Sequence, residues 1–75
     1  MSAVPMVAVT SSNVEAIGWR DGVLHVRYKG GKTFRYQKVP ESLYKRALAA
    51  ESVGSFLYHN VRAHFEHMKV EDGGA

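Results

Sequence analysis

The chain has 75 residues and a formal net charge of +3 at pH 7, with a sequence pI of about 9.5. A chain of this length forms one domain and buries only about 60% of the surface that its unfolded form exposes, so we expect a free energy of unfolding of a few kcal/mol. It contains no cysteine, which excludes disulfides, thiol nucleophiles and cysteine-ligated zinc and is consistent with the cytoplasmic location that we expect.

The first residues are mildly apolar, but they lack a basic segment, and Pro5 interrupts them well short of the apolar core of a secretory signal. No apolar run approaches the roughly 20 residues needed to cross a bilayer. We therefore expect neither a signal peptide nor a membrane partner. Residues 1–8 are predicted to form an N-terminal arm, in which Val7, together with Val9, is able to add an edge strand to the sheet.

The centre of the chain carries the pattern of two consecutive hairpins. Residues 23–37 alternate apolar and polar side chains on either side of two glycines, and residues 14–20 alternate in the same way. Asp21 and Gly22, which separate these segments, favour a two-residue type I′ turn. A three-residue loop over 29–31 keeps apolar residues opposite one another in the second hairpin, whereas a two-residue loop would mix core with solvent. The sequence therefore predicts a three-stranded antiparallel meander.

This register gives the meander one apolar face and one basic face. The apolar face is predicted to pack against helices and comprises Ile17, Trp19, Leu24, Val26, Tyr28, Phe34 and Tyr36. The outer face comprises His25, Arg27, Thr33, Arg35 and Gln37, with Lys29 and Lys32 at the turn. Glu15 falls on the apolar side, near the sheet edge, where it reaches solvent.

Two helices are predicted after the sheet. Pro40 and Glu41 suit the first turn of a helix over about 41–50, whose apolar stripe consists of Leu43, Tyr44, Ala47 and Leu48. Ser52 is a candidate N-cap for a second helix over about 53–63. We thus expect an α+β fold over residues 9–70, in which two helices cover one face of the meander. Residues 65–70 alternate weakly and are able to form a short final strand, and residues 71–75 are expected to be a disordered, solvated tail.

Three segments of the chain together resemble the KTSC domain, a family that takes its name from the C-terminal extension of some lysyl-tRNA synthetases and also includes small free-standing bacterial and phage proteins. They are Ser11-Ser12-Asn13-Val14-Glu15-Ala16-Ile17-Gly18-Trp19, Phe34-Arg35-Tyr36 with Val39-Pro40, and Gly54-Ser55-Phe56 with Asn60-Val61-Arg62. The resemblance covers about residues 9–70. Phe34 stands where the family commonly has the first tyrosine of a Tyr-x-Tyr motif, so one hydroxyl is missing. The resemblance implies the fold and a suggested role in nucleic-acid binding, and it supplies no catalytic residues.

The positive charge is concentrated around the second hairpin. From Arg20 to Arg46 there are eight basic and two acidic residues, a net charge of +6, whereas the chain from Glu51 onward carries −2. The side chains predicted to contact nucleic acid are Arg27, Arg35, Lys29, Lys32, His25 and Gln37. Contacts to phosphates would give a salt-dependent affinity without base specificity, for DNA or RNA. The alternative is an ordinary solvated basic face.

Metal and catalytic chemistry are not expected. His59, His64 and His67 cluster in the sequence, but they lack the i, i+4 spacing that places two imidazoles on one helical face, and Glu66 is the only carboxylate near them. The serines belong to no nucleophile elbow, and the two hairpin glycines belong to no phosphate-binding loop of the Walker type. We expect no metal, no cofactor and no enzymatic activity.

A second interpretation is a protein interaction or homodimerisation module. Val7, Val9 and Val39 are expected near open sheet edges, and a small core favours association. Arg62 is expected to bond helix carbonyls or Glu66 near the end of the second helix, since cations suit a helix C-terminus. The alternative is that Arg62 extends the positive surface.

Overall fold

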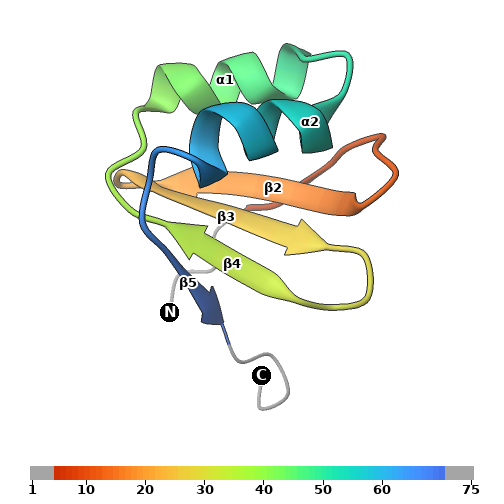
Figure 1. Cartoon of the computed structure of the whole chain (residues 1–75), viewed down its shortest axis with the longest axis horizontal. Helices are drawn as coiled ribbons and strands as arrows, with labels where there is room; N and C mark the ends of the chain where they lie inside the picture. The colour runs from red at the N-terminus through yellow and green to blue at the C-terminus, as the bar shows by residue number, and fades with distance from the viewer. Residues whose placement is uncertain (1–4, 71–75) are drawn as a thin grey trace.

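The structure, a computed structural model, describes residues 5–70, and for residues 67–70 it describes the backbone alone. Five strands form one antiparallel sheet in sequence order: β1 (Val7–Ala8), β2 (Val14–Arg20), β3 (Val23–Tyr28), β4 (Thr33–Tyr36) and β5 (His67–Val70). Helix α1 (Glu41–Ala49), helix α2 (Val53–Leu57) and the π-helical turn η1 (Tyr58–Arg62) lie on one side of this sheet (Figure 1). The predicted meander with helices on one face is confirmed, and short strands extend it at both edges.

The first hairpin has the predicted turn and register. Asp21 and Gly22 have φ angles of 52° and 82°, as a type I′ turn requires, and Trp19 lies opposite Leu24. The turn also holds the segment that leaves the sheet: Val39 donates its N–H to the carbonyl of Gly22 over 2.7 Å, and Trp19 Nε1 donates to the carbonyl of Val39 over 2.7 Å. Val39 is therefore only 1% exposed, and the expectation that it lies near an open edge is wrong.

The second hairpin closes with the predicted three-residue loop. The Tyr28 N–H donates to the carbonyl of Lys32 over 2.7 Å, which brackets the loop. Gly30 and Gly31 both have positive φ, of 102° and 95°, a region that glycine enters without steric cost. As a result, the apolar rows of β3 and β4 face each other on the helix side.

Strand β2 contains a bulge that the alternating pattern did not predict. Val14 pairs with Tyr28 and Ala16 pairs with Arg27, so Glu15 is the extra residue on β2. The bulge turns Val14 into the core, where it is fully buried, and leaves Glu15 exposed. The predicted place of Glu15 on the apolar side is therefore wrong, because alternation does not continue through a bulge.

The core lies between the sheet and the helices. Its buried members are Val14, Ile17, Leu24, Val26, Tyr36, Val39, Ala47, Val53, Leu57 and Val61. Trp19, Tyr28 and Phe34 are partly buried against it, so the predicted packing of the aromatic side chains is confirmed. Within residues 5–70, no helix is long and apolar enough to cross a membrane.

The second helix begins as predicted but changes form after one turn and a half. Ser52 Oγ accepts a hydrogen bond from the Ser55 N–H over 3.3 Å, which confirms the N-cap. Asn60 Nδ2 then donates to the carbonyl of Phe56 over 3.0 Å. This side-chain bond to the helix backbone lies where the π-helical turn forms.

Gly54 allows α2 to lie directly against the loop before β2. A Cβ at this position would come within 3.0 Å of Ser11 Oγ and still closer to the side chain of Asn13. The same Ser11 hydroxyl accepts from the N–H of Val14 over 3.4 Å and thereby shapes the loop. This contact joins two of the three segments on which the family resemblance rests.

Candidate nucleic-acid interface

Strands β3 and β4 bring together four residues of the predicted outer face, three of which are predicted to contact nucleic acid, on the side that points away from the helices. His25 lies directly opposite Arg35, and Arg27 lies directly opposite Thr33. Arg27 is exposed, whereas His25 and Arg35 are half-buried. Because side chains alternate along a strand, the residues between them face the core. We call His25, Arg27, Thr33 and Arg35 the outer face.

Lys29 and Lys32 extend the positive charge beyond the ends of β3 and β4, whereas Gln37 is uncharged and follows the last residue of β4. Lys29 and Lys32 are exposed at the loop that joins β3 to β4. Strand β4 ends at Tyr36, and the Gln37 N–H donates to the carbonyl of Glu66 over 3.1 Å. Gln37 is exposed just past the end of β4, and its contact with nucleic acid stays a prediction.

Few carboxylates neutralise this surface. Ion pairs within the described part of the chain join Arg20 Nε to Asp21 Oδ2 at 3.7 Å and Lys45 Nζ to Glu41 Oε2 at 3.9 Å. None of those described pairs engages Arg27 or the two hairpin lysines. Among the described side chains, the charge of Arg27, Lys29 and Lys32 is thus not neutralised by an ion pair.

Burial and the positive charge of Arg35 lower the pKa of His25 below its ordinary value of 6.5. His25 is therefore predominantly neutral at pH 7. A phosphate placed between His25 and Arg35 would act in the opposite direction, because an anion favours the protonated imidazole.

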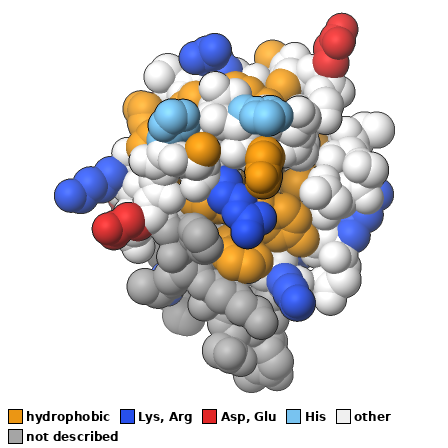
Figure 2. Space-filling model, viewed as in Figure 1, with side chains coloured by type: hydrophobic (Ala, Val, Ile, Leu, Met, Phe, Trp, Pro, Cys, Tyr) orange, Lys and Arg blue, Asp and Glu red, His pale blue; other side chains and the backbone are white. Residues whose placement is uncertain are grey.

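A second group of side chains, on the helix side, was not predicted as a unit. The hydroxyls of Tyr28 and Tyr36 lie 3.3 Å apart, and the rings of Tyr28 and Phe34 meet edge to face with centroids 5.5 Å apart. The Arg62 guanidinium lies 5.9 Å from the centre of the Tyr58 ring. Figure 2 shows this side of the molecule, where a basic side chain lies among hydrophobic ones below two histidines.

The structure gives Arg62 a different neighbour from the one expected. Among the residues with described side chains, Arg62 forms no ion pair with Glu66 and no hydrogen bond to a helix carbonyl, and instead it stacks on Tyr58, which is 60% exposed. The expected structural bonds of Arg62 are therefore wrong. The signal for the actual arrangement was present in the sequence, since Tyr58 precedes Arg62 by four residues and i, i+4 residues are neighbours on a helix.

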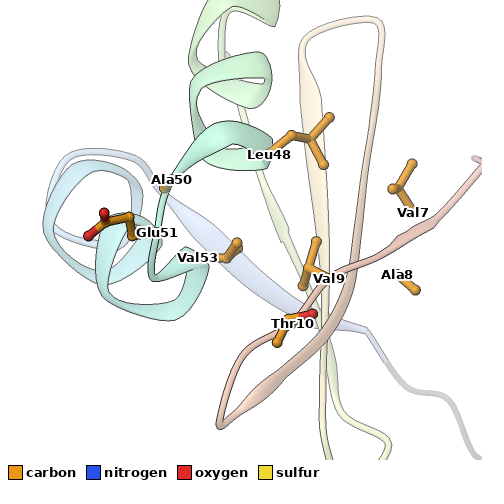
Figure 3. A pocket seen from close by; sticks show the side chains of 8 residues that line it. All are labelled: Val7, Ala8, Val9, Thr10, Leu48, Ala50, Glu51 and Val53. Carbon is orange, nitrogen blue, oxygen red and sulfur yellow. The ribbon is translucent and has the colours of Figure 1, made fainter.

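An open hollow of about 450 Å³ lies between the N-terminal segment and the helices. Figure 3 shows Leu48 and Val53 pointing from the helices toward the segment that carries Val7 and Val9. Val7 is 42% exposed and Leu48 37% exposed. This open hollow, lined by both apolar and polar groups, lies next to β1, an edge strand of the sheet.

The described part of the chain brings no three histidine, aspartate or glutamate side chains together as a metal site would need. His59 lies edge-on to the ring of Tyr58, with centroids 5.3 Å apart. The side chain of His67 lies outside the described residues.

Comparison with known proteins places this fold. The KTSC domain model matches residues 10–65, a range that contains the three segments singled out above. A protein from Tsukamurella paurometabola is 39% identical over 62 residues, which span 80% of this chain and 92% of that protein. The crystal structure of a KTSC domain protein from Yersinia pestis matches with a TM-score of 0.83 and 28% identity, covering 92% of this chain and all of the other. The chain belongs to the KTSC domain family.

Proposed function

We propose that the protein is a small, non-catalytic nucleic-acid-binding module that contacts phosphates with the outer face of its sheet. The observation that carries the proposal is the convergence of Arg27, Arg35 and His25 on one sheet face, on which Arg27 is exposed and paired to no described carboxylate. Lys29 and Lys32 extend this charge to the hairpin tip. A cytoplasmic location would suit this role and a chain without cysteine.

The chemistry of the outer face favours recognition of the nucleic-acid backbone. Arginine forms paired hydrogen bonds with phosphate, and lysine attracts it as a point charge. The outer face has no phenylalanine, tyrosine or tryptophan, so base stacking of the kind seen in RRM domains is not expected there. A two-stranded β-ribbon is narrow enough to enter the major groove of B-DNA. We therefore expect binding with little sequence preference.

Fluorescence anisotropy with a labelled DNA duplex and a labelled single-stranded RNA, both at low salt, tests the proposal. The wild type should bind at least one of them, and the double variant Arg27→Ala/Arg35→Ala should bind about tenfold or more weakly, since hydrogen bonds to charged groups contribute about 1.5–3 kcal/mol each. The matched control is Lys45→Ala/Arg46→Ala, which removes two charges from α1 and should change the affinity less than about twofold. Equal losses in both double variants, or no binding by the wild type, would contradict the proposal.

A second candidate function is self-association through the β1 edge. It rests on the exposed apolar side chains of Val7 and Leu48, which line the open hollow beside the edge strand β1. Sedimentation equilibrium is the test: a dimer that Val7→Lys converts to a monomer would support this candidate. A wild-type chain that stays monomeric at high concentration would exclude it.

A further inference from the structure

We propose a second binding site on the helix side, where Arg62 binds the phosphate of a nucleotide and the exposed ring of Tyr58 stacks on its base. This site shares no residue with the outer face. The choice of a nucleotide over other anions rests on the proposed function. The geometry of the site does not.

The cation of this site is already oriented. The Arg62 guanidinium lies 5.9 Å from the centre of the Tyr58 ring, at a distance where cation–π attraction holds it over the ring. Within the part of the chain whose side chains are described, no carboxylate lies close enough to neutralise Arg62. A planar guanidinium held in this way presents its N–H groups to a phosphate as a fork.

Tyrosine hydroxyls supply further donors near this cation. The hydroxyls of Tyr28 and Tyr36 are 3.3 Å apart, and when Tyr36 donates to Tyr28 the hydroxyl of Tyr28 keeps its own hydrogen for an acceptor on a ligand. Burial, followed by the hydrogen bond from Tyr28, raises the pKa of Tyr36, while the positive charge of Arg62 acts in the opposite direction. The Tyr36 hydroxyl therefore stays protonated at neutral pH and lies within electrostatic reach of Arg62.

The exposed aromatic ring distinguishes this site from a simple anion site. Tyr58 is 60% exposed, although a tyrosine ring offers a large apolar surface that is usually covered. Stacking of a base on an aromatic side chain contributes about 1–3 kcal/mol and tolerates any base. A ligand that carries both a phosphate and a planar base thus uses both groups of the site, whereas inorganic phosphate uses only one.

The chain provides a matched control for Arg62. Arg46, on α1, also lies over an aromatic ring, 5.5 Å from the centre of Phe56. Phe56 is half-buried and carries no hydroxyl, so Arg46 has the same charge and the same kind of stacking without the rest of the site. A difference between the two arginines therefore reports on the site and not on net charge.

The test is an NMR titration of the full chain with adenosine monophosphate, adenosine, inorganic phosphate and a short oligoadenylate. Adenosine monophosphate should shift the signals of η1. Arg62→Gln should lower the affinity for adenosine monophosphate by about tenfold or more, which corresponds to about 1.4 kcal/mol. The affinity of Arg46→Gln for adenosine monophosphate should stay within about twofold of the wild type. Tyr58→Ala should weaken the binding of adenosine monophosphate more than that of inorganic phosphate. Binding of the oligoadenylate at the same signals would show that a nucleotide within a strand also enters the site.

Two results would overturn the inference: adenosine monophosphate leaves the η1 signals unchanged, or Arg62→Gln binds it as tightly as Arg46→Gln does. The double variant Arg27→Ala/Arg35→Ala separates this inference from the proposed function, because it should keep the η1 shifts. If adenosine monophosphate does not shift the η1 signals while oligonucleotides still bind the outer face, the second site alone is contradicted. Intact η1 shifts without any contribution from the outer face would contradict the proposed function alone.

Discussion

The two sides of the β3–β4 hairpin differ in chemistry although they are built from the same strands. In Phe34-Arg35-Tyr36, the two aromatic residues face the helices and the arginine between them faces outward. The outer face is basic and has no phenylalanine, tyrosine or tryptophan, whereas the helix side has several of these rings and Arg62. Within this short motif, alternate residues pack in the core, and the residue between them belongs to the opposite, basic face of the sheet.

The largest effect should separate the two sides by stability. Leu24→Ala removes a fully buried side chain from the core face, which should cost about 2–5 kcal/mol. Arg27→Ala, on the outer face three residues later, should change the free energy of unfolding by less than about 0.5 kcal/mol because the side chain is exposed. Urea denaturation measures both, and similar costs for the two variants would refute the assignment of the faces.

The next largest expected difference is in how the salt dependence of nucleic-acid binding responds to substitutions on the outer face and on the helix side. Each phosphate contact lowers the slope of log K against log salt by about 0.9 for duplex DNA or about 0.7 for a single strand. Arg27→Ala/Arg35→Ala should therefore make this slope shallower by the amount that corresponds to the loss of one to two phosphate contacts. Arg62→Gln should leave the slope for duplex DNA unchanged. Anisotropy titrations over a salt series give the slopes, and a duplex slope that follows Arg62 would reverse the assignment.

A smaller effect tests the hydroxyl pair on the helix side. Tyr28→Phe removes the hydrogen bond to Tyr36 and should cost about 0.5–1.5 kcal/mol. The control is Tyr58→Phe, whose exposed hydroxyl bonds no described residue and should cost less than about 0.5 kcal/mol. Thermal unfolding resolves the difference, since about 1 kcal/mol shifts the Tm of a domain of this size by about 4–8 °C. Equal melting temperatures would show that the pair does not contribute.

The smallest effect concerns the pH dependence of stability. The pKa of His25 is lowered in the folded state, so the unfolded chain binds more protons and the free energy of unfolding should fall as the pH drops below about 6.5, until the folded-state pKa is reached. His25→Gln should remove this part of the slope, and His59→Gln, at an exposed position, should keep it. Urea midpoints from about pH 7.5 to about pH 5 measure the slope. An unchanged slope in His25→Gln would contradict the burial of this imidazole.

Sequence reasoning predicted the meander because turn chemistry and alternation are local signals. Asp21-Gly22 and the three-residue loop determine the register, and the register determines the faces. Alternation failed at Glu15 because a bulge inserts one residue without a distinct local pattern.

The helix-side site was harder to predict for a physical reason. Tyr28, Tyr36 and Arg62 come from two strands and a π-helical turn, so their proximity depends on how the helices pack on the sheet. The hydrogen bond from the Asn60 side chain to the Phe56 carbonyl, which accompanies that turn, cannot be predicted from the helical spacing of apolar residues. Only the contact between Arg62 and Tyr58, four residues apart, could be read from spacing.

The most direct test of the outer face as the nucleic-acid interface is an NMR map of amide shifts during titration of the wild type with a short DNA duplex. The largest shifts should lie at His25, Arg27, Thr33 and Arg35 and at the loop between β3 and β4, and they should diminish as salt is added. Shifts confined to the helix side, or no shifts at low salt, would contradict the role of the outer face as the nucleic-acid interface.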